Sequence, residues 1–86
     1  MKGKEKKSKK QALDADDLLL KIGKRIRQLR IEKGYTSYEY FAYDHNISRA
    51  QFGRYEKGED LRVSSLAKVI NALDVSVKEF FSEGFD

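Results

Sequence analysis

The segment Ser48–Lys57 reads SRAQFGRYEK and has the pattern of a helix with two different faces. An α-helix turns by about 100° per residue, so Phe52 and Tyr55 lie on the same side. The opposite side is then shared by Arg49, Ala50, Gly53, Arg54 and Lys57. The first group predicts a side that anchors the helix in a core, and the second predicts an outward side that is positively charged.

The outward side combines small residues with long hydrogen-bond donors. Glycine inside a helix costs about 1 kcal/mol relative to alanine, so an exposed Gly53 indicates close approach of a large ligand. Arginine can donate two hydrogen bonds to guanine, so Arg49 and Arg54 beside Ala50 predict a helix that reads bases in the major groove of DNA. A solvated cationic face is the alternative for the arginines, and a tight helix crossing is the alternative for Gly53. The interpretation fails if Gly53 packs inside the protein or if the two arginines diverge.

The residues before this segment predict another helix and a short turn. Thr36-x-x-Glu39 has the spacing of a capping box, and Ser48-x-x-Gln51 repeats it at the start of the next helix. Asn46 tolerates the left-handed conformation that a tight turn needs. One face of the earlier helix carries Tyr38, Phe41, Ala42 and His45. Residues 36–57 therefore predict a helix-turn-helix motif, whose second helix contacts bases.

Helical patterns on both sides complete an all-α domain. The first helix is expected from about Asp14 to Lys33, with an apolar side made by Leu19, Ile22, Ile26 and Leu29. A fourth is expected from Ser64 or Ser65 to Leu73, and a short fifth opens with the capping box Ser76-x-x-Glu79. We therefore predict a compact five-helix domain over residues 13–86.

The N-terminal residues 1–12 have a different composition from the rest of the chain. Residues 1–10 contain six lysines and one glutamate and have no apolar spacing, which predicts a disordered tail. Such a tail either keeps the protein in solution or follows the phosphates of DNA. Within the domain, residues 21–62 hold ten basic and six acidic side chains, which favours a polyanion-facing side.

The composition argues against several classes of protein. The 86 residues contain one histidine and no cysteine, and they lack a glycine-rich phosphate loop. We therefore expect no enzyme activity, no metal and no cofactor. No apolar run approaches the roughly 20 residues that a membrane helix needs, and no signal peptide follows the basic N-terminus. We expect a cytoplasmic protein without a membrane partner.

From Ile22 to Phe81 the chain resembles the Cro/CI-type (XRE family) helix-turn-helix domain. The resemblance lies in the segments IGKRIRQLR at 22–30, KGYT at 33–36, FA at 41–42, NIS at 46–48, YEKG at 55–58, LAKVINALDVS at 66–76 and EFF at 79–81. It implies a lambda-repressor-like fold, in which Ala42 lets the two motif helices pack closely and Arg30 forms an internal ion pair with Glu56. It also implies a bacterial or phage transcriptional regulator, typically a repressor in the nucleoid, that binds its operator as a homodimer.

The resemblance also implies particular DNA contacts. Base contacts fall on Ser48, Arg49, Ala50 and Arg54, to which the helical pattern adds Gly53. Contacts to the DNA backbone are assigned to Tyr38, Lys57 and Arg62. Tyr43 is added from its spacing, because core and staple positions account for the neighbouring tyrosines. Tyr38 stands where the family has a phosphate-binding glutamine, in a segment that is one residue longer here, and core packing is the alternative role for it. Glu59 and Asp60 follow the motif and would repel phosphate.

An alternative function within the same fold is that of an antitoxin, which binds and neutralises a small toxin protein. Phe80, Phe81 and Phe85 cluster near the C-terminus. They predict a patch for a homodimer or another partner protein, and the alternative is that they complete the core.

Overall fold

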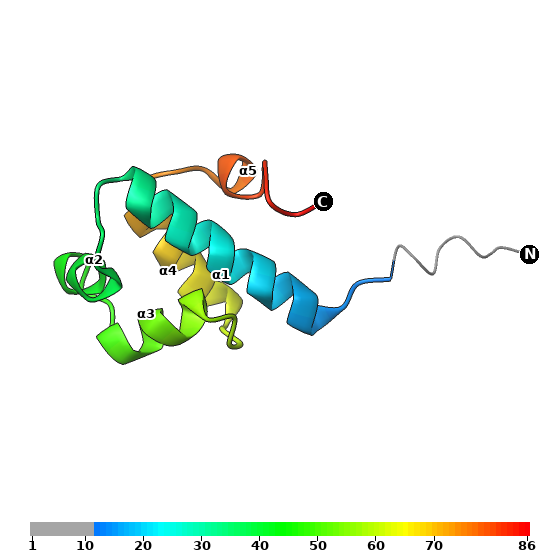
Figure 1. The fold of residues 1–86 in the computed structure, drawn as a ribbon, viewed down its shortest axis with the longest axis horizontal. Coiled ribbons are helices and arrows are strands. Elements are labelled where there is room, and N and C mark those ends of the chain that lie inside the picture. Colours follow the sequence, from blue (N-terminus) through cyan, green and yellow to red (C-terminus); the bar gives the residue numbers. More distant parts are fainter. Residues whose placement is uncertain (1–11) are drawn as a thin grey trace, which may run out of the picture.

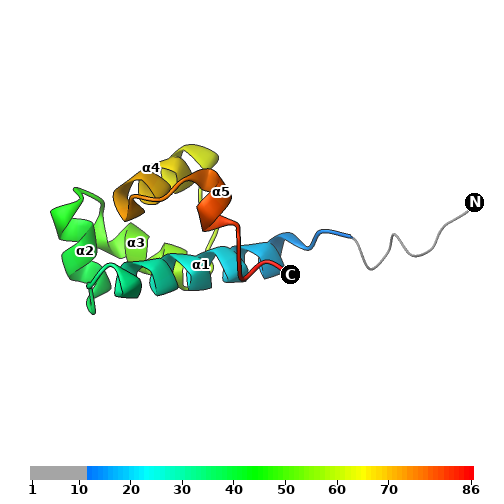
Figure 2. The same cartoon turned by 90° about the horizontal axis from the view of Figure 1, so that it is seen from above.

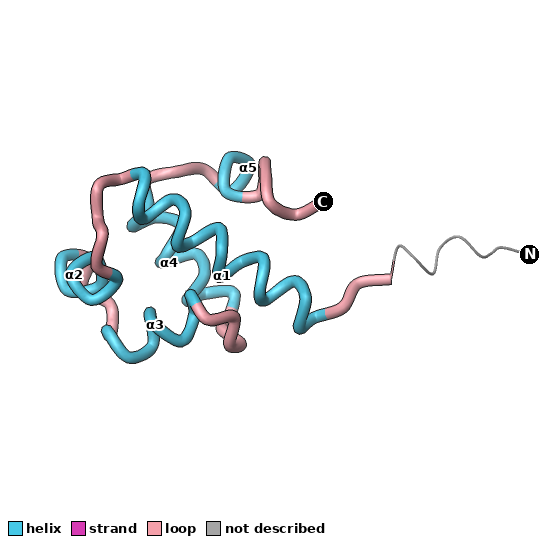
Figure 3. Tube along the Cα trace, in the orientation of Figure 1, coloured by secondary structure: helices cyan, strands magenta, loops and turns pink. Residues whose placement is uncertain are grey.

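The computed structural model describes residues 12–86, and most of the tail expected at residues 1–12 lies outside them. The described part contains α1 (Ala15–Glu32), α2 (Tyr38–Asp44), α3 (Arg49–Glu56), α4 (Val63–Leu73) and α5 (Val77–Phe80). It contains five helices and no strand, which confirms the predicted all-α fold (Figure 3).

The long helix α1 is the platform on which the other helices pack. α2 lies near its C-terminal end, α3 crosses below it, and α4 and α5 cover another side (Figures 1 and 2). The side chains that are almost completely buried are Phe41, Phe52, Phe80, Ile26 and Val69. They come from all five helices, so one core holds α3 in place.

The serine N-caps of two of the predicted capping boxes are confirmed, and the third cap is shifted by a residue. The Ser48 and Ser76 hydroxyls accept hydrogen bonds from the backbone N–H of Gln51 (3.3 Å) and Glu79 (3.0 Å). The cap predicted at Thr36 is wrong, because Ser37 caps α2 and accepts a bond from the N–H of Tyr40 at 3.2 Å. Both neighbours carry a hydroxyl, and the chain becomes helical only after Ser37.

The turn between α2 and α3 has the predicted geometry. Asn46 has a φ of 59°, in the left-handed region that asparagine tolerates. His45 is the C-cap of α2, half-buried, with Nδ1 2.9 Å from the carbonyl oxygen of Phe41. Tyr35 donates a 2.7 Å hydrogen bond to the Asp44 carboxylate, which raises the pKa of the tyrosine. This bond ties the end of α2 to the loop before it.

α4 begins slightly earlier than expected, at Val63 instead of Ser64 or Ser65. Its N-cap residue is Arg62, which makes no side-chain capping bond. Burial therefore stabilises this helix more than capping does, through Val69, Ile70 and Leu73.

Candidate nucleic-acid interface

α3 is anchored on one side, as its sequence pattern predicts. Phe52 is completely buried and Tyr55 is 9% exposed, and the Phe52 ring lies 5.1 Å from the ring of Phe41 on α2. Ser48, Arg49, Ala50, Gln51, Arg54 and Lys57 are exposed. The helix therefore presents polar groups to solvent from a fixed position.

The prediction that Gly53 lies on the open face is wrong. Gly53 is buried, and a β-carbon there would lie 2.7 Å from Cε1 of Tyr38 and 3.0 Å from its Cζ. Real β-carbons do not come so close to other heavy atoms. The glycine is thus needed for the crossing of α2 over α3, which was the alternative explanation, and gives no evidence of a ligand.

The exposed side of α3 is consequently rotated relative to the one expected. Residues Lys57, Ala50, Arg54 and Gln51 follow one another around the helix within about 120°, and all four are exposed. Gln51 was assigned only to the capping box, so its place on this face was missed. The periodicity alone does not show it, because Gln51 lies only about 40° from Tyr55 of the apolar side.

Arg49 and Arg54 are both exposed, but their positions are about 140° apart around the helix. Arg49 is the first residue of α3, so no preceding turn of the helix packs over it. Arg54 Nε is 3.7 Å from the Glu59 carboxylate, in an ion pair whose members are about half exposed. A shallow polar hollow brings Arg54 together with Arg62 and Gln51. The two arginines of α3 therefore diverge and serve different parts of the surface. With the burial of Gly53, both conditions under which the interpretation of this face fails are met, and the helical pattern of α3 alone no longer supports a base-reading helix.

The remaining residues expected at the DNA backbone differ in exposure. Tyr43 is 74% exposed, and Lys57 and Arg62 are also exposed. Tyr38 is half-buried, with its ring against Gly53. Tyr38 therefore packs against α3, which was the alternative role given for it.

A buried ion pair fixes the orientation of α3 on α1. Arg30 donates hydrogen bonds to the Glu56 carboxylate at 2.7 and 3.1 Å, and their side chains are only 4% and 8% exposed. Arg30 also donates to the carbonyl oxygen of Tyr35 at 2.7 Å. At Gly23 of α1, an added β-carbon would lie 2.7 Å from the carbonyl oxygens of Tyr55 and Glu56. The end of α3 therefore lies directly against the backbone of α1.

The aromatic patch predicted at the C-terminus is only partly at the surface. Phe80 is completely buried in the core, so its assignment to a partner patch is wrong. Phe81 is 39% exposed and Phe85 is half-buried, with their ring centroids 4.8 Å apart. The interior needs Phe80 because α5 closes the space between α1 and α4.

One anchoring residue was missed by the sequence analysis. Arg25 is 4% exposed and donates 2.7 Å hydrogen bonds to the carbonyl oxygens of Phe80 and Glu79. It satisfies the carbonyl group of Phe80 at the end of the short helix α5 and adds a bond to that of Glu79, which also accepts from the backbone N–H and the hydroxyl of Ser82. The sequence carries little sign of this role, because arginine is usually exposed.

Residues 12–86 contain no group of three histidine or acidic side chains arranged to hold a metal ion. Among their helices, none combines the length and the apolar character of a membrane span.

Comparison with known protein families gives a match that covers most of the described helices. A family model described as the Cro/C1-type HTH DNA-binding domain matches residues 25–82, which is more than half of the chain. The matched range contains all of α2, α3, α4 and α5, together with the C-terminal half of α1. No curated protein and no solved structure matches the chain.

Proposed function

Because the chain belongs to the family of Cro/C1-type HTH DNA-binding domains, we propose that it is a transcriptional repressor that binds operator DNA sequence-specifically. DNA binding is the function of the family. Repression, an operator and action in the bacterial cytoplasm, at the nucleoid, are our extension of it.

The observation that best supports this proposal is that α3 is buried on one side and exposed on the other. Phe52 and Tyr55 hold the helix in the core, while its first turn and one full side stay exposed. In helix-turn-helix proteins the N-terminal residues of this helix contact base edges in the major groove. We therefore propose base contacts by Ser48, Arg49, Ala50, Gln51 and Arg54.

These side chains offer complementary chemistry to the major groove. Arginine pairs bidentately with guanine, and glutamine pairs bidentately with adenine. Ala50 is short, so it allows the helix backbone to come near the bases. The proposed half-site therefore contains both guanine and adenine.

Contacts to the DNA backbone are proposed for exposed residues around this face. Tyr43 at the end of α2 can donate its hydroxyl to a phosphate oxygen, and Lys57 and Arg62 add positive charge after α3. Tyr38 packs against Gly53 and so helps to hold α3 in place.

We further propose that the protein binds as a homodimer. One helix in one groove gives limited affinity and specificity, and helix-turn-helix dimers read two half-sites about 34 Å apart. We do not place the dimer contact on Phe81 and Phe85, because the burial of Phe80 leaves little of the predicted patch.

The test is selection of bound duplexes from a random DNA pool, followed by titration of the selected site. We expect Arg49→Ala and Arg54→Ala each to weaken specific binding by about 1–3 kcal/mol and to relax the preference at one base pair. Arg27→Ala is the matched control, since it removes an exposed arginine from α1 instead of α3. If the pool yields no enriched sequence, or if the α3 variants bind like the control, the proposal is wrong.

A further inference from the structure

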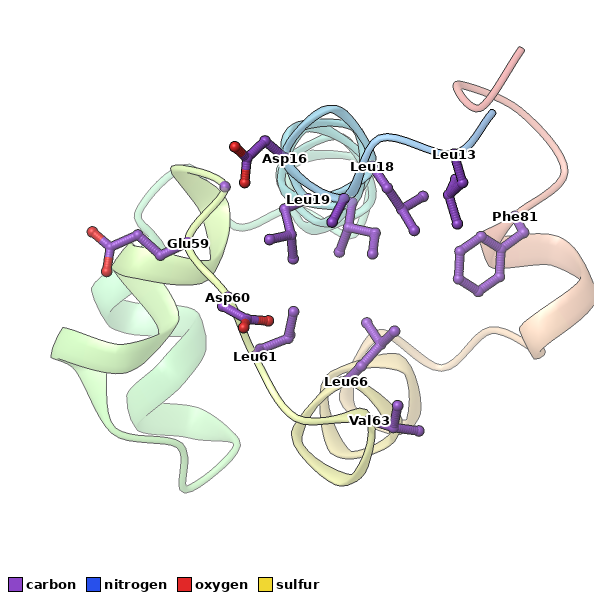
Figure 4. Close-up of a pocket in the computed structure, with 13 residues that line it drawn as sticks. Leu13, Asp16, Leu18, Leu19, Glu59, Asp60, Leu61, Val63, Leu66 and Phe81 are labelled. Atoms are coloured by element: carbon purple, nitrogen blue, oxygen red, sulfur yellow. The ribbon is translucent and has the colours of Figure 1, made fainter. Parts of the chain in front are cut away.

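An apolar groove lies at the end of the domain where the described chain begins. It has a volume of about 720 Å³ and runs between the N-terminal half of α1, the loop after α3, α4 and α5. Figure 4 shows Leu18 and Leu19 of α1 facing Leu61 and Leu66 across this space. Leu18, Leu61 and Leu66 are partly buried and pack against the core, so the floor is a rigid part of the fold.

The walls of the groove are apolar side chains that the core does not use. Leu13 is 78% exposed, Val63 is 83% exposed and Phe81 is 39% exposed. All three line the same groove, and a smaller apolar hollow continues it past Val63 and Phe81 along α4. Such a concentration of exposed apolar groups on a small domain indicates an interaction site.

One edge of the groove is acidic. Asp16, Glu59 and Asp60 border it, and Figure 4 shows them on the side away from Leu13 and Phe81, with the carboxylates of Asp16 and Glu59 pointing away from the space. Glu59 is in the ion pair with Arg54, so Asp60 is the carboxylate nearest to the floor. No lysine or arginine is among the described residues that line the groove. An occupant therefore meets an apolar floor flanked by carboxylates.

We propose that this groove binds an amphipathic, basic helical segment of a second protein. Helices bind such grooves through apolar anchors at positions i, i+3, i+4 and i+7. Lysine or arginine beside these anchors would lie near Asp60 and Asp16, since Glu59 is already paired with Arg54. Charge complementarity of this kind selects among partners and speeds their association.

Other occupants fit the groove less well. A small molecule needs a site that covers most of its surface, and the walls made by Leu13 and Val63 are wide open. A second copy of the chain that bound through the same face would place two concave grooves against each other and bring their acidic edges together. The chain's own residues 1–10 supply lysines but only one apolar side chain, Met1, to fill the floor.

The groove lies at the opposite end of the domain from the start of α3, although it borders the proposed backbone contacts Lys57 and Arg62. α2 and the start of α3 lie at one end in both Figures 1 and 2, and the N-terminal end of α1 lies at the other. A partner in the groove therefore leaves Arg49 and Ala50 accessible. The inference goes beyond the proposed DNA binding and does not depend on it.

The test uses the full chain and a synthetic peptide of about 18 residues, with leucines at the helical anchor positions and lysines elsewhere. Binding is measured by fluorescence anisotropy, and the bound surface is mapped by NMR chemical-shift changes. One control peptide replaces lysine by glutamate, and another keeps the composition but scrambles the leucine spacing. The protein variants are Leu13→Ser/Val63→Ser, Asp60→Asn and the control Ile31→Ser, which changes an exposed apolar residue outside the groove.

We expect saturable one-to-one binding of the lysine peptide, at least about tenfold tighter than that of either control peptide. The Leu13→Ser/Val63→Ser variant should lose about tenfold in affinity, Asp60→Asn should lose about two- to fivefold, and Ile31→Ser should bind normally. Equal binding of the three peptides, or shift changes away from α1, α4 and α5, would overturn the proposal. It would also be overturned if only self-association, measured by sedimentation, responded to the groove variants.

Discussion

The contact between Tyr38 and Gly53 gives a sharp prediction about the packing of α2 on α3. Gly53→Ala adds a methyl group 2.7 Å from Cε1, 3.0 Å from Cζ and 3.1 Å from the hydroxyl oxygen of Tyr38. Ordinary contacts begin at 3.4 Å, so the ring has to move by roughly 0.7 Å or more. Overpacking of this size costs about 1–3 kcal/mol, while replacing glycine by alanine in a helix gains about 1 kcal/mol.

The two terms can be separated by a double-mutant cycle. In the natural chain we expect Gly53→Ala to change the free energy of unfolding by between about zero and −2 kcal/mol. In a Tyr38→Ala background the ring is gone, and the same substitution should gain about 1 kcal/mol. The expected coupling energy is therefore about 1–3 kcal/mol, measured by urea denaturation followed by circular dichroism.

The control is Tyr38→Phe, which keeps the ring and removes the hydroxyl contact at 3.1 Å. Most of the coupling should survive in this background, because the closest atom is Cε1. A gain of about 1 kcal/mol from Gly53→Ala in all three backgrounds would mean that Tyr38 does not cover the glycine. Gly53 would then lie on the open side of α3, as the helical pattern predicts.

Four further perturbations address other parts of the molecule. Gly23→Ala should lower the free energy of unfolding, measured in urea, by about 2 kcal/mol or more, because the added methyl group would clash with backbone carbonyl oxygens at the end of α3 that cannot move away. A neutral result would contradict the close packing of α1 against α3. Glu56→Gln should cost about 3–5 kcal/mol in the same assay, since it leaves the buried Arg30 guanidinium without its counter-charge, and a loss under about 1 kcal/mol would contradict this. Gln51→Ala should relax base preference at an adenine in repeated selection from random DNA, and an unchanged consensus would remove Gln51 from the interface. Deletion of residues 2–10 should flatten the salt dependence of DNA binding, and an unchanged slope would show that the lysines do not contact phosphate.

Features that depend on a few neighbouring residues were predictable from the sequence. The caps at Ser48 and Ser76, and the left-handed turn at Asn46, follow from the local chemistry of these side chains. The ion pair between Arg30 and Glu56 was implied by the family resemblance, and the structure contains it. Where two adjacent residues offer the same group, as Thr36 and Ser37 do, the local pattern does not choose between them.

Features that depend on packing between helices were predicted less well. The helical pattern put Gly53 on the open side because nothing in α3 itself shows that Tyr38 of α2 covers it. Arg25 was not singled out, since its hydrogen bonds go to α5, more than 50 residues along the chain. Phe80 was placed in a surface patch because it clusters with Phe81 and Phe85 near the C-terminus, and nothing in that segment shows that the core buries it. Each error concerns a contact made by a different helix.

The burial of Gly53 changes which residues can allow α3 to approach DNA closely. The cost of glycine in this helix is offset within the protein by the packing of Tyr38, so the glycine needs no external ligand to explain it. The short exposed side chains are then Ser48 and Ala50, both at the start of the helix. That is the end that helix-turn-helix proteins direct toward the bases. The proposed close approach therefore moves to the first turn of α3, with Arg49 and Gln51 beside it and Arg54 one turn further along.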